Sequence, residues 1–287
     1  MKRSKLGFWI FVGPIFLAFL IVVIIPMLRG FYFSFTDWNG ISNEVTFIGL
    51  SNYGKAFRDP EFFAAFKLTA TFAILSVFTI NIMGFLLALL VTQGLRGANF
   101  QRSVFFMPNL IGGLILGFVW QFIFVKAFDN IGSTFNLPFL EGWLSTTTTG
   151  FWGLVILMSW QMSGYMMIIY IAAIQSIPES LIEAAKIDGA NGLQRLKFIT
   201  VPMVMPAFTV GLFLSLSNSF KLFDQNLALT GGAPYGSTEM MALNIYQTAF
   251  SRNQLGYAQA KAVIFLLAVA AITLTQIYLT KSKEVEL

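Results

Sequence analysis

The chain has 287 residues, of which 56% are hydrophobic and only 11% charged, and 32 are phenylalanine. A soluble domain carries about 25% charged residues, so this composition predicts an integral membrane protein. The sequence contains no cysteine and no histidine, which excludes disulfides, thiolate or imidazole metal sites and Ser/His/Asp catalysis. The net charge of +5 comes from Lys and Arg scattered between apolar blocks. We interpret this charge as a topology signal and expect no nucleic-acid partner.

Charge-free windows locate the membrane spans, because a helix needs about 20 apolar residues to cross about 30 Å of hydrocarbon. Six such windows occur, and the polar backbone must be helical wherever lipid contacts it. We therefore predict an all-α membrane protein with one transmembrane domain over residues 1–287. The expected helices are about 8–28, 68–93, 103–124, 150–173, 205–228 and 259–280.

Lys and Arg are concentrated on one side of these helices. Ten of them lie in the 58 residues of segments 1–7, 93–103, 174–206 and 281–287, whereas 6 lie in the 100 residues of the opposite side, segments 30–67, 126–149 and 221–258. The positive-inside rule therefore places both termini in the cytoplasm. The opening MKRSK and the apolar run after it predict a retained first helix, because no small-residue cleavage site follows.

The longest polar break in the apolar chain lies between the fourth and fifth predicted helices. Ser176 and Glu179 have the spacing of a capping box and predict the start of a short helix. Gly189 is suited to the left-handed conformation that ends a helix, and Asn191 is expected to cap a second short helix that Pro202 ends. The sequence thus predicts a helix-turn-helix elbow, which needs a partner because helices this short are not stable alone.

Within this elbow, EAAKIDGA and the spacing from Gly189 to Ile199 and Pro202 resemble the EAA coupling loop of permease subunits in binding-protein-dependent ABC importers. Val201 stands where that family usually has Leu. The stretch IPESLIEAAKIDGA is most similar to carbohydrate permeases of the maltose and multiple-sugar type, in particular the larger, maltose-site-bearing permease of the pair. The resemblance covers nearly the whole chain and implies that a coupling loop at 176–202 contacts an ATPase. The residues it assigns to that contact are Glu183, Ala184, Ala185, Asp188, Gly189, Ile199 and Pro202.

The resemblance implies the six-helix fold of a type I ABC importer permease, which forms half of a sugar pathway and works by alternating access. The implied partners are a second homologous permease, expected to give a hetero-dimer, two cytoplasmic ATPase subunits, an extracytoplasmic sugar-binding protein and the membrane lipid. This chain is expected to be no enzyme and to hold no cofactor or metal. A phosphate-loop-like stretch ends at Lys55, but Ala56 stands where Ser or Thr must hold magnesium. ATP and Mg²⁺ are therefore assigned to the partner ATPase, and the chain to the cytoplasmic membrane of a bacterium or archaeon.

A sugar site needs amide and hydroxyl groups and flat aromatic faces inside a mostly apolar cavity. The third, fourth and fifth predicted helices offer these groups. Carried over by the resemblance, the candidate substrate-binding residues are Asn109, Gly113, Met158, Gln161, Met162, Tyr165, Asn218, Ser219 and Leu222. Met158 and Leu222 are less polar than the family's maltose-binding version, so the sugar is expected to differ from maltose or to be held differently. Direct contact and plain helix packing both stay open for each residue.

Three further features of the third and fifth predicted helices lead to structural predictions: a helix break, a glycine pair and a charged residue. Pro108 and Gly112 interrupt the third helix, and such breaks survive in a membrane only where neighbouring groups or a cavity satisfy the backbone. Gly113 and Gly117 form a small-xxx-small pair suited to close helix contact. Lys221 is close enough to the acid three residues later, Asp224, to pair with it, and either faces a cavity or reaches the outer interface.

The segment Leu229–Phe250 begins with TGGAP and resembles the family's TGGGP segment before the last helix. Met240, Leu243, Tyr246 and Phe250 follow at helical spacing. We expect a Gly/Pro-rich outer loop and then an interfacial or re-entrant helix.

Other classes of protein stay open on the sequence alone. An ion-coupled secondary transporter would need acids within the membrane, and only Asp224 comes near one, while no internal inverted repeat is visible. A membrane enzyme or an assembly scaffold is a second alternative. Without His or Cys, an enzyme would need a carboxylate cluster on one face of a helix, and none is evident in the sequence. Within the family, an amino acid, a polyol or glycerol phosphate is an alternative cargo, although the motifs favour sugars.

Overall fold

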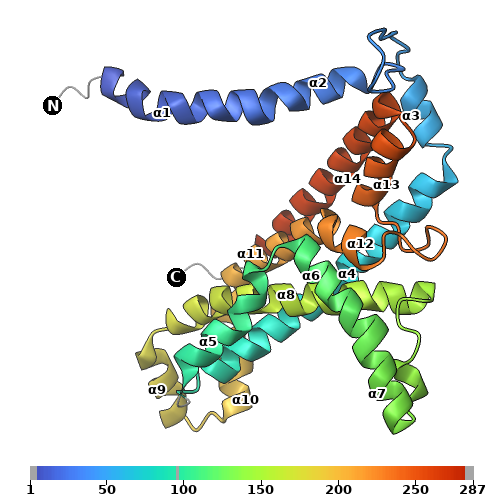
Figure 1. Cartoon of the computed structure of the whole chain (residues 1–287). Coiled ribbons are helices and arrows are strands. Elements are labelled where there is room, and N and C mark those ends of the chain that lie inside the picture. The colour runs from blue at the N-terminus through green and yellow to red at the C-terminus, as the bar shows by residue number, and fades with distance from the viewer. Residues whose placement is uncertain (1–4, 95–96, 282–287) are drawn as a thin grey trace. The chain divides into compact units, whose positions relative to one another are not determined.

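The computed structural model describes residues 5–94 and 97–281. These residues form helices joined by turns and irregular loops, and the β pairing among them is an isolated bridge between Thr36 and Phe47. The helical segments long and apolar enough to cross a membrane in this part of the chain are six: Trp9–Phe33, Pro60–Val91, Gly113–Phe135, Thr147–Gln175, Gly192–Phe220 and Leu255–Lys281 (Figure 1). The predicted all-α class with six membrane helices is confirmed.

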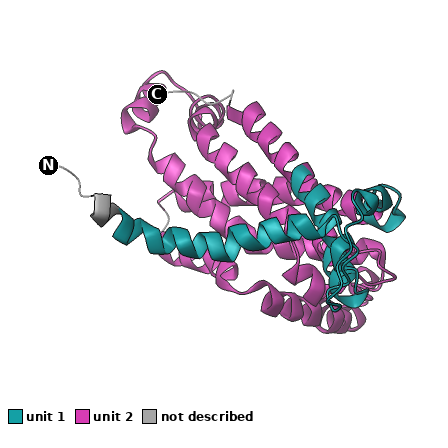
Figure 2. Ribbon diagram, turned by 90° about the horizontal axis from the view of Figure 1, so that it is seen from above, with its two compact units in different colours: residues 1–63, 244–267 teal, residues 64–243, 268–287 magenta. Residues whose placement is uncertain are grey.

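Contacts divide the chain into two compact units. The first comprises residues 1–63 and 244–267, and the second comprises 64–243 and 268–287 (Figure 2). The single domain predicted over the whole chain stays a prediction.

The first unit contains the whole of the first membrane span. It runs as α1 (Lys5–Phe19), a π-helical turn (Leu20–Ile24) and α2 (Ile25–Phe33). None of its most apolar window is buried, and Phe11 is 79% exposed. Such a surface requires lipid or another membrane helix around it, because exposing so large an apolar area to water is unfavourable.

The rest of the first unit joins the start of α4 (Pro60–Val91) to the start of α14 (Leu255–Lys281). The short α3 (Ser51–Ala56) is tied to the end of α2, since the buried Asn52 amide donates to the carbonyls of Ser34 and Thr36 at 3.0 and 2.8 Å. The end of α13 (Met241–Tyr246) and a π-helical turn (Gln247–Ser251) lead into α14. The Asn52 amide thus provides hydrogen-bond donors for backbone carbonyls at the end of α2.

The second unit is built around α8 (Thr147–Gln175), whose most apolar window is 72% buried, the highest share among the six spans of the described chain. The other elements of this unit are α5 (Ala98–Phe106), α6 (Gly113–Phe122), α7 (Phe128–Phe135), α9 (Glu179–Ile187), α10 (Gly192–Arg195), α11 (Val201–Phe220) and α12 (Asp224–Leu229). Helices α5, α11 and α12 all pack on α8. This arrangement makes α8 the core helix of the unit.

Glycines bring the neighbouring helices close to α8. A Cβ added to Gly84 of α4 would lie 2.7 Å from Met166 Cβ, and one added to Gly164 of α8 would overlap the carbonyl group of Phe105 in α5. Small residues at these crossings let backbones approach, which is how membrane helices gain packing energy without a hydrophobic driving force.

A chain of polar groups joins α4, α8 and α11. The Tyr170 hydroxyl donates to Asn81 Oδ1 at 2.5 Å, and Asn81 Nδ2 donates to Ser215 Oγ at 2.8 Å. All three residues are buried. A Cβ on Gly211 would lie 2.5 Å from the Tyr170 hydroxyl, so α11 needs a glycine where it crosses this chain of hydrogen bonds.

The predicted helix bounds are approximate, since α4, for example, begins at Pro60 and not at 68, and two helices also differ in their course. The third begins at Ala98 and is interrupted at Ile111 and Gly112, which are extended with ψ of 129° and 141°, before α6 continues it. The fifth ends at Phe220, and α12 follows as a separate short helix instead of extending it to 228.

Candidate functional site

Residues 176–202 form the predicted elbow. After α9, Gly189 adopts φ of +80°, a left-handed conformation that favours glycine. Asn191 Oδ1 accepts a hydrogen bond from the Gln194 N–H at 2.9 Å, and Gln194 Oε1 accepts one from the Asn191 N–H at 2.8 Å. The predicted roles of Gly189 as helix terminator and Asn191 as cap are confirmed.

Two local predictions in the elbow are wrong. Ser176 does not cap α9, because it ends α8 and its Oγ donates back to the Ala173 carbonyl at 2.8 Å. Pro202 does not end the second helix. Instead, a π-helical turn (Leu196–Thr200), in which the backbone hydrogen bonds differ from those of an α-helix, leads directly into α11. Pro202 lies in the first turn of α11, where its missing N–H is tolerated.

The elbow exposes apolar side chains. Ile187 is 85% exposed, Leu193 is 74% exposed and Phe198 is 67% exposed. Of the residues assigned to the ATPase contact, Glu183, Ala184, Asp188 and Gly189 are exposed, whereas Ala185, Ile199 and Pro202 are half-buried. Large apolar side chains held outward on short helices beside charged ones are typical of a surface that another protein covers.

The candidate substrate-binding residues lie in the second unit and differ in exposure. Met158, Met162 and Leu222 belong to the apolar core, with 2%, 7% and 3% of their surface exposed. The more polar candidates are distributed differently: Asn218 is exposed, Asn109, Gly113 and Tyr165 are half-buried, and Gln161 and Ser219 are buried. The chain by itself therefore offers polar or aromatic surface at Asn109, Tyr165 and Asn218. Sugar contact remains a prediction for every member of the set.

Gln161 lies where α8 meets α12 and the break in the third helix. Its Nε2 donates to the Ile111 carbonyl at 3.2 Å, and its Oε1 accepts from Gln225 Nε2 at 2.8 Å. Because Ile111 is extended, its carbonyl lacks a helical partner, and the amide of Gln161 satisfies it. The expectation that neighbouring groups satisfy this break is confirmed, whereas Gln225 and α12 were missed by the sequence reasoning.

Helix α12 packs on α6 through glycine. A Cβ on Gly117 would lie 2.5 Å from Ala228 Cβ, and a Cβ on Gly113 would lie 2.8 Å from Asp224 Cβ. The predicted close helix contact at this glycine pair is confirmed. Among the described residues no ion pair joins Lys221 and Asp224, and both are exposed. The helical spacing that would bring the two side chains together does not apply, because α11 ends at Phe220 before Lys221, and Asp224 begins α12.

The loop after α12 is held by a polar network around Asn226. The Asn226 amide donates to the Thr238 carbonyl at 2.8 Å, and its Oδ1 accepts from the Met240 N–H at 3.0 Å. The loop presents Tyr235 with its side chain fully exposed, at a φ of 52°. A turn rich in glycine is thereby given a fixed shape.

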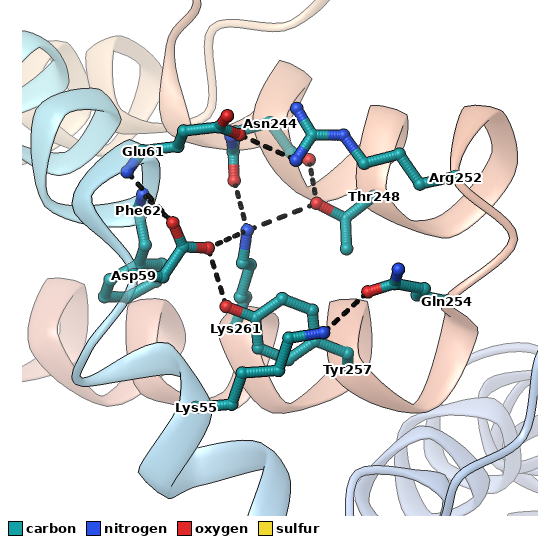
Figure 3. Close-up of polar contacts among 10 residues, drawn as sticks. All are labelled: Lys55, Asp59, Glu61, Phe62, Asn244, Thr248, Arg252, Gln254, Tyr257 and Lys261. Carbon is teal, nitrogen blue, oxygen red and sulfur yellow. Dashed lines mark hydrogen bonds and ion pairs between the residues drawn. The ribbon is translucent and has the colours of Figure 1, made fainter.

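The first unit contains a buried polar cluster that the sequence reasoning missed (Figure 3). Lys261, in the second turn of α14, has no exposed surface, and its Nζ lies 2.9 Å from Asp59 Oδ2. The same ammonium group donates to Asn244 Oδ1 at 3.0 Å and to Thr248 Oγ1 at 3.3 Å, while the Tyr257 hydroxyl donates to Asp59 Oδ2 at 2.6 Å. The buried cation is therefore fully surrounded by acceptors, as a charge in such a place must be.

Electrostatics hold Asp59 ionised. Burial opposes its ionisation, but the hydrogen bonds from Tyr257 and Lys261 and the positive charge of Lys261 outweigh that effect. Together they lower the pKa of Asp59 from 3.8 to about 2. Lys55 lies beside the cluster, with its Nζ 2.8 Å from Gln254 Oε1 and 4.0 Å from the centre of the Tyr257 ring. The lysine of the phosphate-loop-like stretch is thus engaged in this structural cluster.

The comparisons with known proteins agree with the fold and identify the family. Residues 80–284 match the family of the binding-protein-dependent transport system inner membrane component. The chain belongs to this family, the permeases that form the membrane part of binding-protein-dependent ABC importers. The resemblance inferred from the elbow is thereby confirmed.

Several relatives are similar over their full length. The probable starch degradation products transport system permease AmyD of Thermoanaerobacterium thermosulfurigenes is 54% identical, covering 99% of this chain and 97% of that protein. The multiple sugar-binding transport system permease MsmF of Streptococcus mutans is 30% identical, covering 98% of each. The trehalose/maltose transport system permease MalF of Thermococcus litoralis is 29% identical, covering 97% and 94%.

Solved structures share the fold. A chain of a bacterial ABC transporter involved in the import of the acidic polysaccharide alginate matches with a TM-score of 0.84 at 22% identity, covering 98% of this chain and 96% of that chain. A bacterial alginate transporter in complex with its alginate pentasaccharide-bound periplasmic protein matches with a TM-score of 0.85 over the same shares. At this identity the likeness establishes the fold.

Proposed function

We propose that this chain is the permease subunit of an ATP-driven sugar importer, with oligosaccharides from starch as its cargo. The observation that carries the proposal is the 54% identity, over 99% of the chain, to a permease named for starch degradation products. Relatives named for multiple sugars and for trehalose and maltose support the same class of cargo. These names favour neither an amino acid, polyol or glycerol phosphate nor an ion-coupled secondary transporter.

The proposal requires partners. Six helices form half of a pathway, so a second homologous permease completes it, as a hetero-dimer. Two cytoplasmic ATPase subunits bind ATP and Mg²⁺ and carry out the hydrolysis, while this chain holds no cofactor and performs no catalysis. The exposed Ile187, Leu193 and Phe198 support docking of an ATPase on the elbow. An extracytoplasmic sugar-binding protein delivers the substrate.

In the proposed orientation both termini and the elbow face the cytoplasm. The excess of Lys and Arg on that side supports this orientation. Part of that count comes from residues 1–4, 95–96 and 282–287, which lie outside the described residues. The loop that presents Tyr235 then faces the exterior, where the binding protein docks.

The elbow is suited to act as a lever because both of its arms continue into membrane helices. The first arm, α9, follows α8 after a short turn, and the second arm, α10, runs through the π-helical turn into α11. Helices α8 and α11 are joined to α4 through Tyr170, Asn81 and Ser215. Movement of the elbow by an ATPase would therefore reach the core of the bundle. ATP must bind one state of the importer better than the other for this movement to occur.

Uptake of labelled maltotriose into proteoliposomes that contain the complete importer tests the proposal. Accumulation is expected to require both internal ATP and the binding protein, and to persist when ionophores collapse ion gradients. Uptake that follows an ion gradient without ATP would identify a secondary transporter. Uptake of an amino acid or polyol with no uptake of sugar would overturn the assigned cargo.

A further inference from the structure

Gln225 and Gln161 form an amide pair at the break in the third helix. Gln225 Nε2 donates to Gln161 Oε1 at 2.8 Å, and Gln161 Nε2 donates to the Ile111 carbonyl at 3.2 Å. Three segments of the second unit, α12, α8 and the extended residues before α6, are thereby joined through two carboxamides. A carboxamide supplies two donors and a carbonyl acceptor, so this pair has hydrogen-bonding capacity beyond these two bonds.

The two amides differ in what they can offer a ligand. Gln161 is only 7% exposed, and both its carbonyl oxygen and one N–H are engaged within the chain. Gln225 is half-buried, and within the described residues no donor is recorded for its Oε1. The outer member of the pair therefore presents an acceptor and a second N–H, whereas the inner member is occupied.

The surroundings fix where Gln225 points. A Cβ on Gly113 would lie 3.1 Å from both Cδ and Oε1 of Gln225, so the amide lies directly over the glycine at the start of α6. Gly113 and Gln161, two of the residues proposed to line the sugar pathway, thus lie against Gln225, and Leu222, a third, comes three residues before it in the sequence. A carboxamide held by a second carboxamide can both accept from and donate to a sugar hydroxyl at a defined angle, which a mobile side chain cannot do.

We infer that Gln225 contacts the sugar and sets specificity, and that Gln161 acts as the positioning residue that aims it. This assignment rests on the proposed function, because it names a contact within the same pathway. It also reassigns Gln161, which the family resemblance had placed in contact with substrate. The open acceptor on Gln225 selects a hydroxyl donor, so the inference concerns neutral, polyhydroxylated cargo.

Transport kinetics of the complete importer in proteoliposomes test the contact, with labelled maltotriose as the probe. Gln225→Met keeps the shape and removes the hydrogen bonds, and it is expected to raise KM about tenfold while kcat stays within about twofold. Gln161→Met should raise KM in the same direction. The double variant should be no worse than Gln225→Met alone, because the two residues act through one contact.

Gln121→Met is the matched control. Gln121 also lies at the packing of α6 and α12, where its Nε2 donates to the Leu229 carbonyl at 3.2 Å, but it is two turns away from the break. The Gln121→Met substitution should leave KM unchanged. An unchanged KM in Gln225→Met, or an equal rise in Gln121→Met, would overturn the inference and reduce the pair to a packing contact.

A second measurement tests which of the two amides is accessible from the pathway, whatever the cargo is. The natural chain has no cysteine, so Gln225→Cys and Gln161→Cys each introduce one thiol into it. In the assembled importer, a small hydrophilic thiol reagent should modify the first at least about tenfold faster than the second, because only the thiolate in contact with water reacts. Equal rates would refute the assignment. Failure of the wild-type importer to take up maltotriose would instead contradict the proposed cargo, and the thiol rates would still test the assignment of Gln225 as the accessible member of the pair.

Discussion

Lys261 Nζ lies 2.9 Å from Asp59 Oδ2, and the lysine has no exposed surface. The pair joins the start of the last membrane helix to the residue that precedes α4. Removing one partner from such a pair leaves a buried charge without compensation, which is far more costly than removing both.

Asp59→Asn is therefore expected to lower the free energy of unfolding by about 3–5 kcal/mol. The double variant Asp59→Asn/Lys261→Met should recover much of that loss, because it removes the stranded cation. Denaturant unfolding of the purified importer in detergent measures both. Glu61→Gln is the control, since it breaks the exposed ion pair between Arg252 and Glu61 and should cost less than about 1 kcal/mol. Equal effects of Asp59→Asn and Glu61→Gln would contradict the structural role of the buried pair.

The same pair predicts a dependence of stability on acid. The pKa of Asp59 is lowered to about 2 in the folded chain, so the unfolded chain binds its proton more tightly. The stabilisation is complete above the ordinary pKa of 3.8 and is lost as the pH falls through the folded value near 2. Between these values wild type should lose stability more steeply than Asp59→Asn/Lys261→Met. Parallel curves for the two proteins would mean that Asp59 does not carry the effect.

Substitutions at two glycines of the elbow, Gly189 and Gly192, are expected to differ in their effect on uptake. Gly189 has φ of +80°, which proline cannot adopt and alanine adopts only with strain, so Gly189→Pro should abolish uptake and Gly189→Ala should reduce it. Gly192 begins α10 in open space, and Gly192→Ala should leave uptake near wild type. Glu183→Lys, on the exposed face of α9, should also abolish uptake while the protein stays in the membrane. Immunoblots of membranes and uptake assays separate loss of protein from loss of coupling. Normal transport by Gly189→Pro would remove the lever role of the elbow.

Asn109 and Tyr165, two half-buried candidates for the sugar pathway, predict a change in selectivity. Asn109→Ala and Tyr165→Ala should alter the affinity or the order of preference among maltose, maltotriose and longer oligosaccharides, because each removes a polar or aromatic contact. The ATPase subunits should still co-purify with both variants. Competition of unlabelled sugars against labelled maltotriose measures the preference. If neither variant alters it, these two residues pack and do not bind sugar.

The sequence predicts the parts of the fold that depend on local signals. Charge-free windows locate the six helices because each must satisfy its own backbone in lipid. Gly189 and Asn191 mark the elbow because a left-handed residue and a cap act within a few positions of themselves. Family resemblance, rather than spacing, supplies the candidate sugar residues, and the structure places Met158, Met162 and Leu222 in the core.

The parts that could not be predicted depend on partners far apart in the chain. Lys261 falls just before the last charge-free window, but its acceptors Asp59 and Asn244 come from elsewhere in the sequence, and nothing local identifies them. Gln225 meets Gln161 across 64 positions, and only the break before α6 hints that an amide is needed there. Lys221 and Asp224 show the opposite error, since a spacing that pairs side chains within one helix fails across a helix end.

Cross-linking of the elbow to the ATPase tests the central claim most directly. Ile187→Cys introduces a thiol at an 85% exposed elbow position of a chain that has no natural cysteine, and Phe139→Cys introduces one at a 70% exposed position on the side proposed to be external. A thiol-to-amine cross-linker added to open membranes that contain the importer should join position 187 to the ATPase subunit, with a yield that changes when ATP binds. Position 139 should not be joined to it. An elbow thiol that reacts with an impermeant reagent from outside intact cells, or that never cross-links to the ATPase in any nucleotide state, would contradict the account.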